Sequence, residues 1–90
     1  MTVKVELDGR MMTDRAATHD YLARRLQFPS HYGKNLDALY DLLTEYSQPW
    51  EIRITHAEEI KNQLGIYGST LLQTFLEAEN DNLSLTVTLV

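Results

Sequence analysis

The sequence predicts an α/β protein, with a three-stranded parallel sheet packed by about four helices. Three segments, near the start, the middle and the end of the chain, alternate apolar and polar residues as β-strands do. The two stretches between them each have room for two helices and carry apolar residues at helical spacing. Helices between strands imply parallel pairing through right-handed crossovers. The length of 90 residues fits one domain over residues 1–90.

The first strand is expected over residues 3–7, where two valines and a leucine alternate with charged residues. Asp8 and Gly9 then turn the chain. Thr13 is the expected N-cap of the first helix, with an aspartate in its first turn. Pro29 prevents a continuation of this helix beyond about residue 26. The buried side of the helix is expected at Ala17, Tyr21, Leu22 and Leu26.

The second helix is expected to begin after Asn35, which can act as its N-cap, and to end before Pro49. Asp37, Asp41 and Glu45 follow one another at intervals of four residues, so their carboxylates form an acidic column along one side. Like charges at this spacing repel each other, and no base neutralises them along the helix. Selection for helix stability alone would more often place a base in this column. The apolar arc on the other side consists of Leu36, Leu39, Tyr40, Leu42, Leu43 and Tyr46.

The rest of the chain repeats the pattern of strand, two helices and strand. A second strand is expected over residues 50–54 and a short helix over about residues 56–64. Gly65 and Gly68 are expected to bracket a turn, after which Ser69 caps a fourth helix. The last strand is expected from alternating apolar residues at Leu83, Leu85, Val87 and Leu89.

Composition and charge exclude several classes of function. The chain has no cysteine, and therefore no disulfide or thiol chemistry. It has neither a secretory signal nor an apolar run of roughly 18 residues, so a cytoplasmic location is expected. Residues 1–34 carry six bases and four acids, whereas residues 35–90 carry two bases and nine acids. This acidic field disfavours nucleic acid and anionic membrane as partners and favours a cationic partner, although acidic residues also serve solubility.

No enzyme, metal or cofactor is expected. The three histidines, His19, His31 and His56, lie in different segments and are interpreted as surface or capping residues, with more functional weight on His31 beside the acidic helix. They form no zinc-binding pair, and the four glycines form no phosphate-binding loop. Asp37 and Asp41 could imitate an acid–base pair, but an exposed helix face does not raise the pKa of a carboxyl group.

Residues 32–43, Tyr-Gly-Lys-Asn-Leu-Asp-Ala-Leu-Tyr-Asp-Leu-Leu, resemble the barstar family of ribonuclease inhibitors. The shared core is Tyr-Gly-x-Asn-Leu-Asp-Ala-Leu-x-Asp-x-Leu. The resemblance extends at lower fidelity over the whole chain, for example at Leu26, Phe28, Pro29, Leu72, Gln73, Phe75, Glu77 and Ala78.

The resemblance implies a cytosolic protein that is monomeric when free, is not an enzyme, and binds a basic, secreted, barnase-like microbial ribonuclease one to one. It also implies that the acidic helix and its preceding loop occlude the cationic active site, with Asp41 where an RNA phosphate would bind. The alternatives are an immunity or antitoxin protein against another nuclease or a non-nuclease toxin, and a regulatory interaction module. The partner-binding residues that the resemblance implies are His31, Gly33, Asn35, Asp37, Ala38, Tyr40, Asp41, Thr44, Tyr46 and Glu77.

The sequence departs from the family's best-known member at four of these or neighbouring positions. His31 replaces a tyrosine, Tyr40 and Tyr46 replace tryptophans, and Lys34 replaces an acid. Lys34 is expected to reduce the local negative potential, and His31 can add a pH dependence near neutrality. Two interpretations stay open, namely a nuclease with an acid opposite Lys34 and a different toxin.

Overall fold

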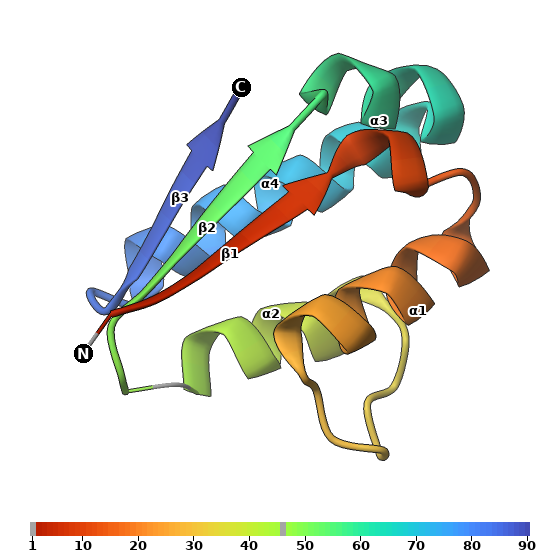
Figure 1. Cartoon of the computed structure of the whole chain (residues 1–90). Helices are drawn as coiled ribbons and strands as arrows, with labels where there is room; N and C mark the ends of the chain where they lie inside the picture. The colour runs from red at the N-terminus through yellow and green to blue at the C-terminus, as the bar shows by residue number, and fades with distance from the viewer. Residues whose placement is uncertain (1, 46) are drawn as a thin grey trace.

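A computed structural model describes residues 2–45 and 47–90 and confirms the predicted α/β architecture (Figure 1). The strands and helices alternate in the expected order, and a short 3₁₀ helix follows the first strand. The elements are β1 (Val3–Asp8), the 3₁₀ helix η1 (Gly9–Met11), α1 (Arg15–Leu26), α2 (Leu36–Glu45), β2 (Trp50–Thr55), α3 (Ala57–Leu64), α4 (Ile66–Asp81) and β3 (Leu85–Leu89).

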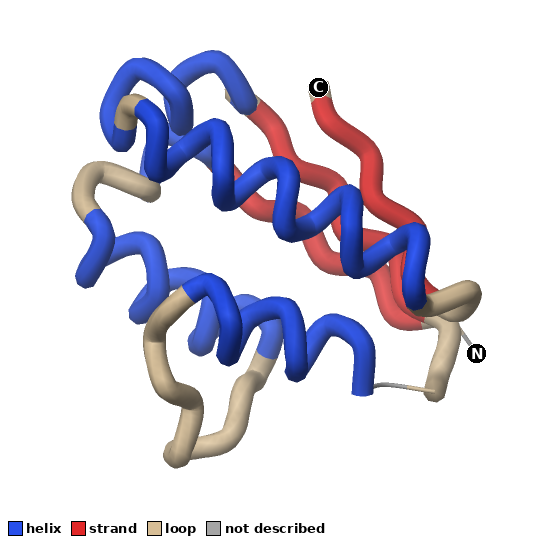
Figure 2. Tube along the Cα trace, turned by 180° about the vertical axis from the view of Figure 1, so that it is seen from behind, coloured by secondary structure: helices blue, strands red, loops and turns tan. Residues whose placement is uncertain are grey.

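The three strands form a parallel sheet in the order β1-β2-β3. Two right-handed crossovers that advance in the same direction place their helices on the same face of a sheet. Burial agrees, because Trp50, Ile52 and Ile54 of β2 are buried whereas Glu51 and Arg53 between them are exposed. The protein therefore has two layers, with the helices on one side of the sheet (Figures 1 and 2).

The hydrophobic core lies between the sheet and the helices. Leu7 and Ile54 from the sheet, Leu39 from α2 and Phe75 from α4 are completely buried. The two helices α2 and α4 also pack against each other, although 20 residues separate their ends in the sequence. This packing places the exposed side of α2 next to the exposed side of α4. No helix in the described part of the chain is both long and apolar enough to cross a membrane.

Two predicted helix starts are wrong. Asp14, not Thr13, caps α1, because its side chain accepts a hydrogen bond of 2.7 Å from the backbone N–H of Ala17. Helix α4 begins at Ile66, so Ser69 lies inside it and does not cap it. Gly68 lies buried within α4 and is therefore not a turn residue. A glycine is needed there because a Cβ atom would lie 2.4 Å from the Ile60 carbonyl oxygen.

The last strand is shorter than predicted. It begins at Leu85, and Leu83 is fully exposed in the turn before it. Leu89 is 38% exposed because β3 is an edge strand that only one neighbour covers. Along this strand, therefore, the alternation of residue types does not translate into regular burial.

Side chains of the helices form hydrogen bonds with backbone groups at both edges of the sheet. At the β1 edge, the N–H of Asp8 donates to the Tyr21 hydroxyl over 2.8 Å, and the Arg25 guanidinium donates to the Glu6 carbonyl, also over 2.8 Å. At the β3 edge, the N–H of Val87 donates to the Glu79 carboxylate over 2.7 Å. Unpaired edge groups are templates for pairing with another strand, so these contacts protect the sheet.

Candidate partner-binding surface

The predicted site residues in the described part of the chain come from the loop before α2, from α2 itself and from α4. Asn35 caps α2 as expected, since its Oδ1 accepts a hydrogen bond of 2.7 Å from the N–H of Ala38. The cap fixes the first turn of α2, which carries Asp37. Tyr46 lies outside the described residues.

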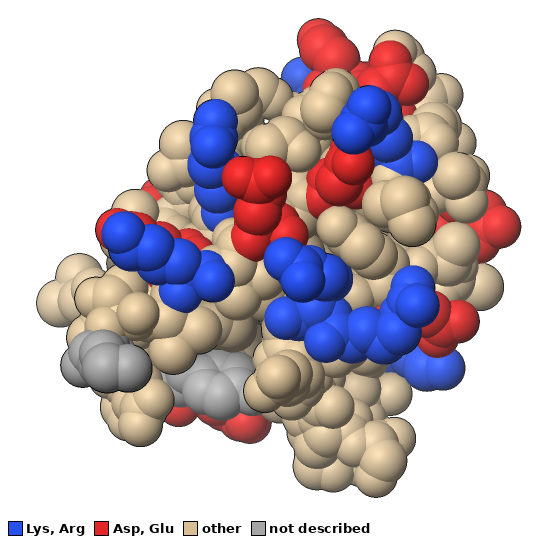
Figure 3. Space-filling model, viewed as in Figure 1, with Lys and Arg blue, Asp and Glu red and all other residues tan. Residues whose placement is uncertain are grey.

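The acidic column is exposed, as predicted. Asp37, Asp41 and Glu45 are exposed on α2, while Leu39 and Leu43 on the opposite side are completely buried. Among residues 2–45 and 47–90, no base forms an ion pair with Asp37 or Asp41. Lys and Arg side chains gather instead over the side of the molecule formed by β1 and α1 (Figure 3). The negative charge of the column is therefore available to a partner.

A hollow of about 650 Å³ lies between α2 and α4 and joins residues that are distant in the sequence. Glu77 of α4 reaches it together with Asp37 and Asp41 of α2, so the structure brings these three predicted carboxylates to one place. The rest of its lining consists of Leu36, Tyr40, Thr70 and Thr74. We refer to it as the acidic hollow.

Tyr40 and Thr44 are half-buried on the flank of the acidic column. The Tyr40 hydroxyl donates a hydrogen bond to the Asp81 carboxylate at the end of α4, and this bond raises the pKa of Tyr40. Thr44 donates to the Tyr40 carbonyl over 2.9 Å. Tyr40 thus links α2 to α4 across the surface, while the Thr44 hydroxyl is occupied by its own helix.

His31 and Gly33 are exposed in the loop before α2. Gly33 does not have a left-handed backbone, but a Cβ atom there would lie 3.3 Å from the Cβ of Ala38. The loop backbone therefore lies tightly against the first turn of α2. Whether His31, Gly33 and Ala38 contact a partner stays a prediction.

His19 is completely enclosed, contrary to its interpretation as a surface or capping residue. Its Nδ1 lies 2.6 Å from the hydroxyl of Tyr32 in the loop, and its Nε2 lies 2.6 Å from the hydroxyl of Tyr67 on α4. Burial lowers the pKa of His19, against a smaller opposing effect of Asp20. Burial likewise raises the pKa of Tyr32. One signal was present in the sequence, since positions 19, 22 and 26 share a helix face.

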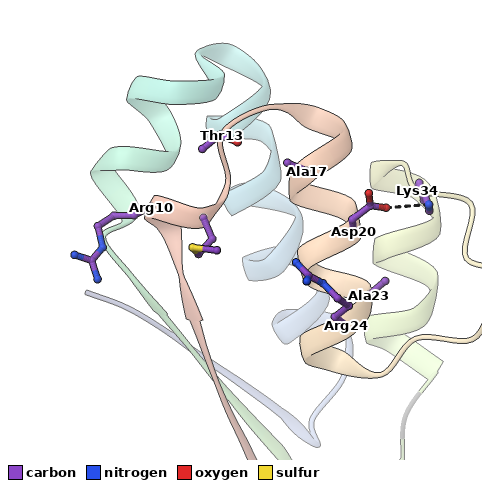
Figure 4. A pocket seen from close by; sticks show the side chains of 8 residues that line it. Arg10, Thr13, Ala17, Asp20, Ala23, Arg24 and Lys34 are labelled. Carbon is purple, nitrogen blue, oxygen red and sulfur yellow. Dashed lines mark ion pairs between the residues drawn. The ribbon is translucent and has the colours of Figure 1, made fainter.

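Lys34 is held by α1. Its ammonium group forms an ion pair of 2.9 Å with Asp20, which Figure 4 shows, and the pair lowers the pKa of Asp20. The backbone of Lys34 is left-handed, with φ at 55°. The positive charge of Lys34 is therefore neutralised by an acid of the same chain. The sequence alone did not predict this ion pair.

Two comparisons relate the chain to known proteins. A sequence model of the family described as "Barstar (barnase inhibitor)" matches residues 2–90. A protein of Bacillus subtilis (strain 168), named "Putative ribonuclease inhibitor YrdF", is 35% identical over 79 residues, which cover 87% of this chain and 87% of that protein.

Proposed function

The chain belongs to the barstar family, which makes it an inhibitor protein and not an enzyme, and from this premise we propose that it inhibits a basic, secreted, barnase-like microbial ribonuclease. The complex is one to one. The acidic column, Glu77 and the loop before α2 enter the active-site cleft and occlude it. The protein acts in the cytoplasm and is monomeric when free.

Asp37 and Asp41 are exposed and pair with no base among the residues that the structure describes, and this observation best supports the proposal. A ribonuclease active site must be cationic because it binds a polyanion. Carboxylates on a helix imitate the spacing of negative charges along that polyanion. A helix also fixes the positions of these carboxylates more rigidly than a mobile loop would. The acidic hollow adds Glu77 from a second helix, so the charged groups spread over a surface.

Tyr40 supplies apolar contact beside these charges. An aromatic residue at the border of a charged surface gives the desolvated contact that exposed carboxylates lack. Its hydrogen bond to Asp81 fixes the ring before binding, which reduces the entropy lost on association. Charge then governs the encounter, while the aromatic contact prolongs the complex.

A titration of the purified protein into barnase and a panel of other microbial ribonucleases tests the proposal, with deoxyribonucleases as the comparison. We expect stoichiometric inhibition of at least one ribonuclease and an association rate that falls as salt is added. Inhibition of deoxyribonucleases alone would support the alternative of an immunity protein against another nuclease. If no ribonuclease is inhibited at micromolar concentration, the proposed function is wrong.

A further inference from the structure

We propose that Arg15, the first residue of α1, determines which ribonuclease the protein accepts, by binding a carboxylate at the rim of the enzyme's cationic cleft. This inference rests on the proposed function and extends the partner-binding surface beyond the residues that the family resemblance implies. It makes the surface bipolar, with the acidic hollow at its centre and one base at its border.

Arg15 lies in a second hollow, of about 470 Å³, next to the acidic hollow. The two hollows share Leu36 and Asp37, so they lie on either side of the first turn of α2. Asn35, the cap of α2, also lines the second hollow. A partner seated on Asp37 therefore comes within reach of the Arg15 side chain.

The guanidinium of Arg15 is held in place before any partner arrives. Its central carbon lies 4.1 Å from the centre of the Tyr67 ring, which is a cation–π contact. The Tyr67 hydroxyl is in turn 2.6 Å from Nε2 of the buried His19. A stacked guanidinium keeps its N–H donors free at the edge of its plane, where they match the two oxygens of a carboxylate.

Arg15 forms no ion pair within the described residues. Lys34, the other base that lines this hollow, is paired with Asp20, whereas none of the carboxylates in residues 2–45 and 47–90 forms an ion pair with Arg15. Helix stability does not explain the residue either. The positive end of the helix dipole lies at the N-terminus of α1, and a cation there is unfavourable.

A base that forms no ion pair within the described residues, placed beside three carboxylates, discriminates between basic enzymes. A ribonuclease with a carboxylate opposite Arg15 gains a charge-assisted pair, whereas an enzyme with a base there meets like-charge repulsion. One of the two interpretations left open by the sequence placed an acid of the nuclease opposite Lys34. Because Asp20 already pairs with Lys34, we assign this contact to Arg15 instead.

The test compares Arg15→Glu with Arg24→Glu, using the ribonuclease that the wild-type protein inhibits in the titration above. Arg24 is the matched control because it is exposed on the same helix but lines a different hollow, with Arg10 and Thr13 (Figure 4). Both variants change the net charge equally. We expect Arg15→Glu to weaken binding by about ten- to a hundredfold, mainly through faster dissociation. Arg24→Glu should leave dissociation unchanged.

Folding does not confound this comparison. An acid in the first turn of a helix is favourable, so Arg15→Glu should retain the wild-type thermal midpoint to within a few degrees. A carboxylate-to-lysine scan of the ribonuclease then identifies the opposite group, since one such change should restore binding of Arg15→Glu. If the wild type inhibits the enzyme and the two variants dissociate at the same rate, Arg15 is not a contact and only this inference fails. If the wild type inhibits no ribonuclease, the proposed function fails and this inference with it.

Discussion

The hydroxyl of Tyr32 lies 2.6 Å from Nδ1 of His19, and this contact ties the loop before α2 to the middle of α1. Lys34 makes a second tie through Asp20, the next residue of the same helix. Two neighbouring residues of α1 therefore fix the loop that ends in the cap of α2. The position of the acidic column depends on a helix that carries none of its charges.

Replacement of Tyr32 by phenylalanine should loosen this loop. The variant leaves a buried nitrogen of His19 without its partner, so we expect a loss of about 1–2 kcal/mol in the free energy of unfolding and a weaker inhibitor. Urea denaturation and an inhibition titration measure the two effects. Tyr67→Phe is the control, because Tyr67 is only half-buried and water can take the place of its hydroxyl. Equal losses of inhibition in both variants would contradict a special role for the loop contact.

Stability should decrease as the pH falls below about 6.5, the ordinary pKa of histidine. Burial holds the pKa of His19 below that value in the folded protein, so the unfolded chain takes up a proton that the folded protein does not. Above about 6.5 the imidazole is neutral in both states and its contribution is constant. The difference in unfolding free energy between wild type and His19→Gln should therefore shrink on acidification. A pH-independent difference for His19→Gln would refute the assignment.

Asp41→Ala should reduce inhibition without affecting the fold. The carboxylate is exposed and has no internal ion pair among the described residues, so its removal leaves no buried group unsatisfied. In the complex it leaves cationic groups of the enzyme without a partner, and we expect binding to weaken by about 2–3 kcal/mol. Calorimetric titration measures the change. Glu58→Ala on α3 removes the same charge at an exposed position outside the partner-binding surface, and it should have little effect on inhibition. Undiminished inhibition by Asp41→Ala would show that the wrong surface has been assigned.

Gly68→Ala should destabilise the protein although it improves helix propensity. The added Cβ would lie 2.4 Å from the Ile60 carbonyl oxygen, so α3 and α4 must separate. Overpacking of this kind costs about 1–3 kcal/mol. Thermal unfolding followed by circular dichroism measures the loss. Ser69→Ala, at the next and exposed position of α4, should be close to neutral. A Gly68→Ala variant as stable as the wild type would mean that the two helices can move apart freely.

Glu79→Ala should open the β3 edge of the sheet. The N–H of Val87 loses the carboxylate that occupies it, and an unpaired edge group can bind a second chain. We expect concentration-dependent association by sedimentation velocity, together with a loss of about 1 kcal/mol in unfolding free energy. Glu79→Gln keeps an acceptor oxygen and should behave like the wild type. Association of both variants to the same degree would point to charge and not to the hydrogen bond.

The sequence was sufficient where structure depends on neighbours along the chain. The period of α2 and its Asn35 cap are local features, so the buried Leu39 and the exposed Asp41 follow directly from the pattern. The choice between Thr13 and Asp14 as a cap was wrong because both residue types suit that position.

Contacts between distant segments could not be predicted in this way. The glycine at position 68 reflects the approach of Ile60, and the turn that its residue type suggested does not exist. His19 meets Tyr67 across 48 residues, and Lys34 meets Asp20 only because the loop folds back on α1. For the candidate site, the sequence predicted which side chains of α2 are exposed but not how Arg15 and the acidic hollow lie around them.

The bond between Tyr40 and Asp81 implies an order of events during synthesis of the protein. When residue 45 of a nascent chain has just emerged from the ribosome, Asp37 and Asp41 are present, but Glu77 and Asp81 are not yet there to complete the surface. The acidic hollow is complete only when translation has passed α4. A truncated product that ends before α4 would keep the sequence motif of residues 32–43 and yet lack both Glu77 and the Asp81 partner of Tyr40.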